Sequence, residues 1–252
     1  MKKMLFIAAA AALTFTACKK DDSVDNPGGE TSKLLKKITK TEDDVTVVYN
    51  LVYDGNKRLT SITSSDNLEK TLISYDAAGN IVKVEETEAD FKNIYTYTYA
   101  NNIPVSATFK SWELTAGEPD DLIENDILTY TVQNDQVTNI HLEMTMHEEE
   151  ADFKLSYTNG NLTKIETVDS DLYTATFVYG NKKAPFPKLS KYVLDQAGFS
   201  LQFFAKNELL SATYDFPDTF LDRTITTQYT YDGAGFPLTS NDGETVMSFE
   251  YQ

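Results

Sequence analysis

Two histidines are the first residues of this chain to consider for chemistry. His141 and His147 lie in the segment HLEMTMH, which misses the HExxH spacing of zinc hydrolases. If this segment is a strand, both rings share a face but stand roughly 20 Å apart, so they cannot bind one metal ion together. Leu142, Met144 and Met146 then take the core face. We therefore expect the two histidines on a solvated strand face.

Acidic clusters are the second group with possible chemistry. They occur at 118–121, at 148–150 and between Asp215 and Asp222. Carboxylate oxygens are the ligands that calcium prefers, but none of these clusters has the pattern of an EF-hand loop. The chain carries 39 acidic and 22 basic residues, so acidic clusters arise from composition alone. The sequence also lacks a G-x-S-x-G turn and a phosphate-binding glycine loop. We expect no metal, no other cofactor and no catalytic residue.

The single tryptophan marks a candidate binding loop. Trp112 lies in KSWELTAGEPDDLIEND, residues 110–126, which interrupts the surrounding pattern. Irregular loops that carry large aromatic side chains are frequent binding surfaces. The candidate ligand-binding residues are Trp112, Glu118, Asp120, Asp121 and Glu124. In the alternative interpretation, Trp112 fills the interior of the fold.

A repeated unit supplies the framework for these residues. A tyrosine is followed by a turn rich in Asp, Asn and Gly, and then by two aliphatic residues spaced three apart, as in Tyr53-DGNKR-Leu59-TS-Ile62 and Tyr157-TNGN-Leu162-TK-Ile165. Such self-similarity indicates a repeat architecture. The aliphatic residues that start the units give nine units. They lie at 35, 59, 81, 105, 137, 162, 189, 209 and 238.

Each unit is predicted to contain two strands. The residues before each tyrosine alternate between apolar and polar, as in 45–53 and 172–180, which is the period of a β-strand with one wet face. Asp76-Ala77-Ala78-Gly79 suits a type I turn followed by a left-handed glycine, and Asn159-Gly160 suits a two-residue hairpin. The spacing of three after each turn does not fit a plain strand, so we expect a bulge there. Tyr75 and Tyr157 should face inward, and Thr60 and Thr163 should face water.

The motif Tyr75-DAAGN-Ile81-VK-Val84 resembles the YD repeat of the RHS family. The resemblance covers most of residues 34–251 and implies one long antiparallel sheet of side-by-side hairpins. Roughly eighteen short strands are too many for a flat sheet. We expect an all-β fold, an antiparallel meander of about nine hairpin units that curls into a barrel-like roll or a two-layer wrap. Its short and charged strands do not fit a transmembrane barrel.

The first residues predict export. Lys2 and Lys3 precede an apolar run from Met4 to Phe15, which is the pattern of a signal peptide. The run ends in Leu13-TFTA-Cys18, which resembles a bacterial lipobox and implies a lipid on Cys18, the only cysteine. The predicted parts are a signal peptide at 1–17, a lipidated Cys18 with a disordered tether at 18–33, and a repeat domain at 34–252. Lys-Lys-Asp-Asp at 19–22 resembles the surface-export signals of some outer-membrane lipoproteins.

The charge of the chain and its predicted location together define the expected function. The mature chain has 20 basic and 39 acidic residues, and this acidity argues against nucleic acid as a partner. The expected location is the outer membrane, at the cell surface or on the periplasmic face. The sequence favours a non-enzymatic lipoprotein that contacts the membrane only through its anchor and binds a glycan, a peptide or an envelope protein. The alternative is a glycan-directed hydrolase that uses a carboxylate pair drawn from Asp120, Asp121 and Glu124.

Overall fold

The computed structural model describes residues 33–252, except 169–172, 197–200 and 202. The predicted signal peptide and Cys18 therefore lie outside the described residues. The strands are Leu35–Glu42 (β1), Val45–Tyr53 (β2), Leu59–Ser64 (β3), Lys70–Tyr75 (β4), Ile81–Thr87 (β5), Phe91–Ala100 (β6), Ile103–Glu113 (β7), Asp121–Gln133 (β8), Gln136–Met144 (β9), Glu149–Thr158 (β10), Asn161–Val168 (β11), Thr174–Lys183 (β12), Asn207–Asp215 (β13), Arg223–Thr226 (β14), Gln228–Tyr231 (β15), Pro237–Asn241 (β16) and Thr245–Tyr251 (β17).

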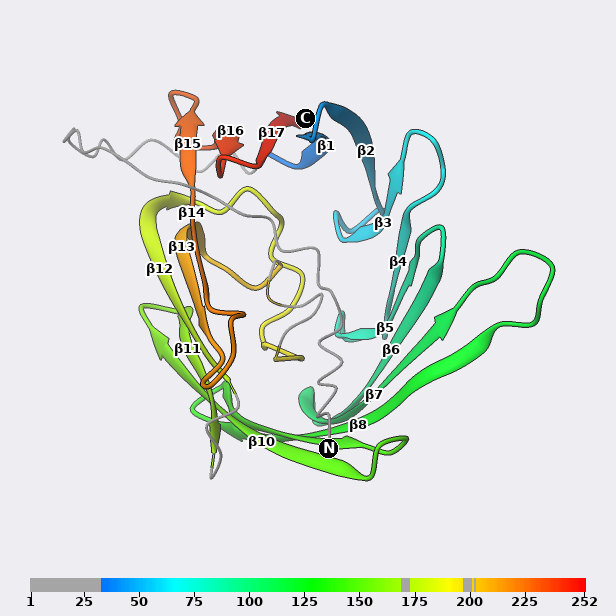
Figure 1. Ribbon diagram of the computed structural model, residues 1–252. Helices are drawn as coiled ribbons and strands as arrows, with labels where there is room; N and C mark the ends of the chain where they lie inside the picture. Colours follow the sequence, from blue (N-terminus) through cyan, green and yellow to red (C-terminus); the bar gives the residue numbers. More distant parts are fainter. Residues whose placement is uncertain (1–32, 169–172, 197–200, 202) are drawn as a thin grey trace.

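These 17 strands form a nearly closed antiparallel barrel (Figure 1). Each strand from β1 to β13 pairs with the next one along the chain. Strand β15 pairs with β16, and β16 pairs with β17. Strand β17 pairs with β1, which joins the two ends of the chain in the barrel wall. At the seam, β14 pairs with β13, and the chain continues through Thr227 into β15, which pairs with β16. The Tyr229 hydroxyl donates to the carbonyl of Leu209 at 3.2 Å across this seam. The predicted all-β meander is confirmed.

The repeated tyrosine has a structural role at one end of the barrel. In three units its hydroxyl donates to the carbonyl of an aliphatic residue near the start of the preceding strand: from Tyr53 to Leu35 at 2.7 Å, from Tyr75 to Leu59 at 2.8 Å and from Tyr157 to Val137 at 2.8 Å. The register shifts at each such turn, where Tyr75 lies opposite Ile81 while Ser74 lies opposite Lys83. The predicted bulge is therefore present. Burial raises the pKa of Tyr75 to about 12.

The threonine in the bulge does more than face water. The Thr60 hydroxyl donates to the carbonyl of Val52 at 3.1 Å, and the Thr163 hydroxyl donates to the carbonyl of Ser156 at 3.1 Å. A bulge interrupts the ladder of backbone hydrogen bonds, and these hydroxyls satisfy a carbonyl opposite it. Both threonines are also partly exposed to solvent, so the predicted contact with water and the hydrogen bond occur together.

The turns follow the predicted chemistry. Gly79 is left-handed with a φ of 89°, and Asn159 and Gly160 have φ values of 53° and 83°, as a tight two-residue turn requires. The Asp76 carboxylate accepts the backbone N–H of Asn80 at 2.8 Å. The equivalent turn after Tyr53 places a lysine, Lys57, in the left-handed position with a φ of 62°.

We expect Lys57→Gly to stabilise the protein by about 0.5–1 kcal/mol, because a side chain in this conformation is strained and glycine is not. Gly79→Lys is the matched control and should cost about 1–2 kcal/mol by the same strain. A Cβ at Gly79 would meet only the Arg58 Nη1 atom at 3.8 Å, an ordinary contact. Urea melts of both variants measure the difference. A destabilised Lys57→Gly would contradict this assignment of strain.

The unit expected to start at Leu189 is not a hairpin. Between β12 and β13 the described residues of 184–206, here called the inner loop, form no strand and pack inside the barrel. Leu194 is 1% exposed, and its carbonyl accepts the Tyr130 hydroxyl at 2.5 Å. Phe204 packs edge-on against Tyr157, with ring centroids 5.9 Å apart. The spacing of aliphatic residues matched the repeat here, but nine residues separate Tyr179 from Leu189, compared with five between Tyr75 and Ile81.

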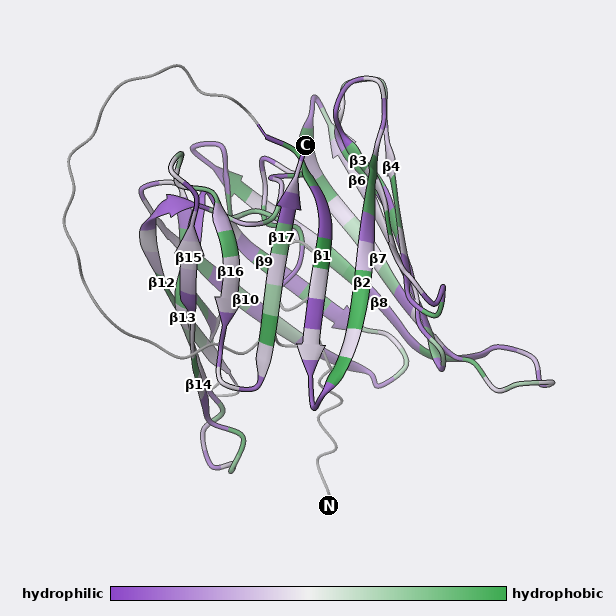
Figure 2. Ribbon diagram, turned by 90° about the horizontal axis from the view of Figure 1, so that it is seen from above, coloured by the Kyte–Doolittle hydropathy of each residue, from purple (hydrophilic) through white to green (hydrophobic). Residues whose placement is uncertain are grey.

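The barrel is apolar inside and polar outside. The side chains that face inward form one large buried cluster, which includes Val84, Ile140 and Ile165. Strands in Figure 2 alternate between hydrophilic and hydrophobic residues along their length. The outer positions carry ion pairs such as Lys83–Glu85 at 2.9 Å. In the part of the chain that the structure describes, no helix has the length and apolarity to cross a membrane.

Candidate functional site

A row of polar side chains crosses the inner wall of the barrel. Glu86 on β5 lies opposite Asn93 on β6, Asn93 opposite Ser111 on β7, and Ser111 opposite Glu124 on β8. Directly paired residues in an antiparallel sheet point to the same face. Asp126 follows Glu124 by two residues and shares this face. We call Glu86, Asn93, Ser111 and Glu124 the polar row.

The polar row lies toward one end of the barrel. The tyrosine turns, Leu34 and Gln252 lie at the opposite end, which we call the termini end, where Leu34 and Gln252 exchange two backbone hydrogen bonds. The inner loop begins and ends there and contacts Tyr130 and Tyr157, the inward residues near those turns. The other end, the loop end, carries the connections at 65–69, 114–120 and 216–222. The inner loop therefore packs against the wall near the termini end, and the polar row lies nearer the loop end.

The carboxylates of this wall are unusually hard to ionise. Burial, together with the charge of Asp195, raises the pKa of Glu86 to about 7. Burial raises the pKa of Asp126 to about 6, partly offset by the charge of His147. Burial and the charge of Asp126 also raise the pKa of Glu124. Protein therefore surrounds these groups on most sides, although Glu86 and Glu124 keep part of their accessible surface.

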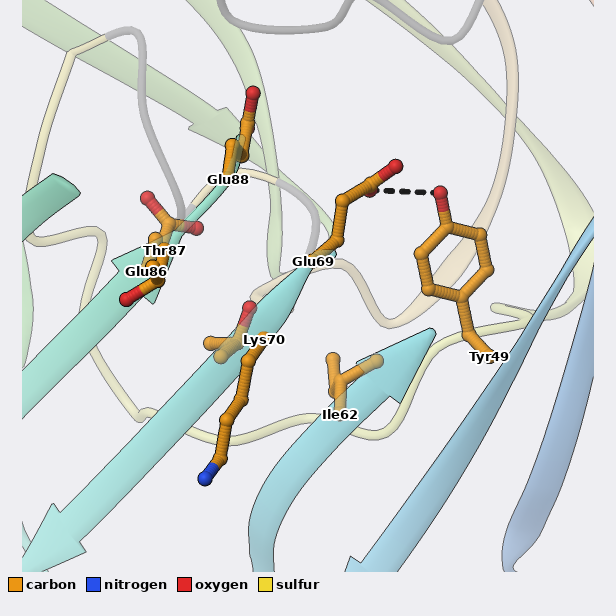
Figure 3. Close-up of a pocket in the computed structure, with 8 residues that line it drawn as sticks. Tyr49, Ile62, Glu69, Lys70, Glu86, Thr87 and Glu88 are labelled. Carbon is orange, nitrogen blue, oxygen red and sulfur yellow. Dashed lines mark hydrogen bonds between the residues drawn. The ribbon is translucent and has the colours of Figure 1, made fainter. Parts of the chain in front are cut away.

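A small cavity opens beside Glu86. It has a volume of about 70 Å³ and is lined by Tyr49, Ile62, Glu69, Lys70, Thr71, Glu86, Thr87 and Glu88 (Figure 3). The Tyr49 hydroxyl donates to the Glu69 carboxylate at 2.8 Å. The Lys70 side chain extends away from Glu69 and Glu88 in this view. Three carboxylates, those of Glu69, Glu86 and Glu88, therefore border the cavity, and the Lys70 ammonium group points away from it.

Aromatic rings form the wall across the barrel from the polar row. Tyr173 contacts Phe216, Tyr214 and Phe153, with ring centroids 5.2, 6.3 and 6.4 Å apart. These residues lie on or next to β10, β12 and β13. In Figure 1, β12 and β13 lie on the left, across the interior from β5 and β6. The loop end thus combines an acidic wall and an aromatic wall.

The residues of the predicted binding loop do not form one loop. Trp112 belongs to strand β7, where its outer-face ring lies 5.7 Å from the Lys92 Nζ atom. Glu118 and Asp120 lie on the exposed connection between β7 and β8, which Asp121 ends. Glu124 points inward and joins the polar row. The expected loop of 110–126 is wrong in extent because both strands continue through most of it.

The histidines lie near the loop end. His141 is on the outer face of β9, and its Nδ1 atom lies 3.0 Å from the Asp152 carboxylate. Strand β9 ends at Met144, so His147 lies in the turn and Met146 is 47% exposed, contrary to the expected core position. Among the described residues no group of three His, Cys, Asp or Glu side chains has the geometry to hold a metal ion.

Sequence reasoning missed the polar row except for Glu124. The sequence did contain a signal for the row. Glu86, Asn93 and Ser111 occupy inward positions in three consecutive strands whose residues alternate between the two faces of the sheet. Finding the row requires the register between four strands, which the sequence pattern did not provide.

The fold and this interior define a class of nearly closed antiparallel barrels with a loop packed inside. One solved structure of similar fold is a porin-like protein from Bacteroides vulgatus ATCC 8482. It is 15% identical, aligns with a TM-score of 0.56, and the match covers 88% of this chain and 99% of that one. No family model matches the chain, and no curated protein matches it. The likeness is one of fold.

Proposed function

We propose that this protein is a lipid-anchored envelope protein of the outer membrane whose barrel stands in water and binds a ligand at its loop end. The proposal includes the predicted lipid on Cys18 and a framework of YD-type hairpins. The ligand classes that suit it are a glycan, a peptide or a segment of an envelope protein. The role is binding rather than catalysis.

The surface polarity supports a barrel that stands in water. A membrane-spanning barrel presents an unbroken apolar band to lipid and keeps its interior polar. This barrel carries outer ion pairs such as Lys154–Glu166 at 3.8 Å and threonine pairs such as Thr213–Thr224 at 3.2 Å. Its interior holds the apolar core.

The position of Leu34 supports one orientation of the barrel relative to the membrane. Leu34 lies at the termini end, so a tether from Cys18 reaches the barrel on that side. The loop end then points away from the membrane. In this proposed orientation, a ligand approaches the acidic and aromatic walls from the loop end.

One observation supports a ligand at this place above all others. The Oδ1 atom of Asn93 is buried in the middle of the polar row with no hydrogen-bond partner among the described residues. Buried acceptors without donors cost free energy, and native proteins keep few of them. A bound molecule that donates hydrogen bonds removes this cost.

Blocking the polar row tests the proposal. Ser111→Phe places a ring between Asn93 and Glu124, and Lys110→Phe places the same ring on the outer face as the matched control. We expect a ligand found by a glycan array or by pull-down to be lost with Ser111→Phe and kept with Lys110→Phe. Equal capture by both variants would place the ligand on the outer loops instead.

Removing the predicted anchor tests the proposed location at the membrane. Cys18→Ala should prevent lipid attachment and release the protein from the membrane fraction, because the thiol is the group that accepts the lipid. Fractionation with labelled fatty acid measures both effects. Continued membrane association of the variant, with no labelled lipid, would assign the anchoring to another feature.

A hydrolase is the second candidate, favoured by one observation. Glu124 and Asp126 lie two residues apart on one face, roughly 7 Å along the strand, which is within the range of glycosidase carboxylate pairs. The raised pKa of Asp126, about 6, suits a general acid. Hydrolysis of a bound glycan that disappears in Asp126→Asn, with binding retained, would favour this candidate over pure binding.

A further inference from the structure

We propose that the termini end of the barrel docks onto an anionic membrane surface through a group of lysines, which form a second membrane contact beside the lipid anchor. This inference rests on the proposed anchor and goes beyond it, since the sequence predicts the anchor as the only contact with the membrane. We call these residues the lysine patch. They are Lys33, Lys182, Lys183, Lys188 and Lys206.

The lysine patch gathers around the turn between β15 and β16. The Lys183 Nζ atom lies 4.1 Å from the centroid of the Phe236 ring, and the Lys33 Nζ atom lies 5.4 Å from the same centroid. A Cβ at Gly235, in the same turn, would lie 3.7 Å from the Lys182 side chain. Three lysine side chains from two distant segments therefore meet at one turn.

The other two lysines belong to the inner loop. The Lys206 carbonyl accepts the backbone N–H of Ala184 at 3.4 Å. Lys206 therefore lies next to the end of β12, which carries Lys182 and Lys183. Burial and the charge of Lys206 lower the pKa of Lys188, so these two ammonium groups are close enough to repel each other.

Carboxylates of the protein offset little of this positive charge. Lys33 pairs with Asp232 at 2.5 Å. No ion pair joins the other four lysines to a carboxylate in the described part of the chain, and all four are exposed or partly exposed. Glu208 lies nearby but is 2% exposed, and its carboxylate accepts the backbone N–H of Lys182 at 2.6 Å and the Tyr231 hydroxyl at 3.2 Å. An anionic surface supplies the negative charge that the patch lacks.

The opposite end of the barrel carries the opposite charge. The described connections of the loop end contain aspartate and glutamate but no lysine or arginine. They are residues 43–44, 65–69, 88–90, 114–120, 145–148, 216–222 and 242–244.

Distance separates the acidic end from the patch. A strand of nine residues, such as β2, is roughly 30 Å long at the rise of a β-strand. At physiological ionic strength, salt screens charges beyond about 8 Å. The termini end therefore attracts an anionic surface, although the whole chain has a formal charge of −17.

The membrane that holds the anchor is the surface that the patch meets. Leu34 lies at the termini end, and the predicted tether at 18–33 spans roughly 20 Å as a random coil. Such a short link keeps the patch near the head groups at a high effective concentration. Each lysine close to an anionic surface then favours docking roughly five-fold.

Energy transfer to labelled head groups tests the docking on the lipidated protein. The vesicles contain phosphatidylcholine with or without anionic phosphatidylglycerol. A dye is attached at Gly233→Cys, where an added side chain meets open space. We expect stronger transfer in the anionic vesicles and loss of this increase at high salt, because salt screens the contact. A dye at Ala116→Cys, on the exposed connection of the loop end, should show no increase.

Replacing lysines tests the patch itself. Glutamine at the four unpaired positions (Lys182→Gln, Lys183→Gln, Lys188→Gln and Lys206→Gln) should lower the ratio of docked to free barrels by about 100-fold or more. A matched control with the same net charge should keep docking, because its four lysines lie on strands away from the patch. It combines Lys70→Gln, Lys92→Gln, Lys110→Gln and Lys154→Gln. Arginine at the four patch positions keeps the charge and should also keep docking, which separates charge from folding.

Three results would overturn the inference. Equal transfer from Gly233→Cys in both kinds of vesicle would exclude docking by charge. Equal losses in the two glutamine variants would assign the effect to net charge, and a larger increase at Ala116→Cys would place the loop end on the membrane. A protein that associates with neither kind of vesicle would refute the proposed anchor, and this inference with it. Association without a response to phosphatidylglycerol would refute the docking alone.

Discussion

Replacing Tyr157 with alanine should lower the free energy of unfolding by about 3–5 kcal/mol, the range for truncation of an aromatic side chain in a core. Two contacts are lost together. The hydroxyl no longer donates to the carbonyl of Val137, which lies 2.8 Å away. The ring no longer packs against Phe204, so the inner loop also loses a contact that fixes it inside the barrel.

Two further variants separate these contributions. Tyr157→Phe keeps the ring and removes only the hydrogen bond, which should cost about 1–2 kcal/mol. Thr163→Ala removes the hydroxyl that donates to the carbonyl of Ser156 and should cost about 1 kcal/mol. Urea melts give all three values. Equal losses for Tyr157→Ala and Thr163→Ala would refute the inward placement of the tyrosine.

The second large effect is a fall in stability between pH 4.5 and pH 7. The ordinary pKa of a glutamate is 4.5, and burial and Asp195 raise that of Glu86 to about 7. A carboxyl whose pKa is raised by folding stabilises the folded state while it is protonated, and this contribution is lost as the pH rises through the folded value. The upper limit for Glu86 is about 3 kcal/mol, since one pKa unit corresponds to about 1.4 kcal/mol. Asp126, with a pKa of about 6, acts in the same direction.

Carboxylates at the turns act in the opposite direction at lower pH. Hydrogen bonds from Asn80 lower the pKa of Asp76, and the Lys33 ammonium lowers that of Asp232. Their contribution is present above the ordinary value of 3.8 and is lost as the pH falls through the lowered values. We therefore expect maximal stability near pH 5, where the turn carboxylates are ionised and the inner carboxyls are still largely protonated.

Glu86→Gln isolates the inner group. The variant should be more stable than the parent at pH 8 and nearly equal to it at pH 4, whereas Glu85→Gln should follow the parent at both pH values. Thermal melts across this range measure the slope. A parent protein whose stability rises steadily from pH 4.5 to pH 8, with no change in Glu86→Gln, would contradict the buried position of Glu86.

Local features of the fold could be predicted because they depend on neighbouring residues. The left-handed Gly79, the tight turn at Asn159-Gly160 and the bulge after each turn follow from turn chemistry and from period-two alternation. Counting the nine units predicts roughly eighteen strands, and the described residues form 17. The inward placement of the tyrosines was also predicted, although their hydrogen bonds to carbonyls of the preceding strand were not.

The rest depends on contacts between distant residues. The inner loop matches the repeat spacing at Leu189, and its packing against Tyr130 and Tyr157 inside the barrel could not be predicted from that spacing. Trp112 was assigned to a loop because its segment interrupts the repeat, but pairing with β6 and β8 extends the strand. The polar row was missed because Glu86 and Glu124 lie 38 positions apart and meet only through the register of β5 to β8.

The labelling of a single outer cysteine tests most directly whether the outside of the barrel faces water. Cys18 is the only native cysteine and is predicted to carry the lipid, so an added cysteine reacts alone. Thr96→Cys lies on the exposed outer face in the middle of β6, and Ala107→Cys, at a position 3% exposed, is the inner control. In open outer-membrane fragments without detergent, we predict rapid reaction of Thr96→Cys with a charged maleimide and slow reaction of Ala107→Cys. Protection of Thr96→Cys until detergent is added would place the outer face in lipid and contradict this account.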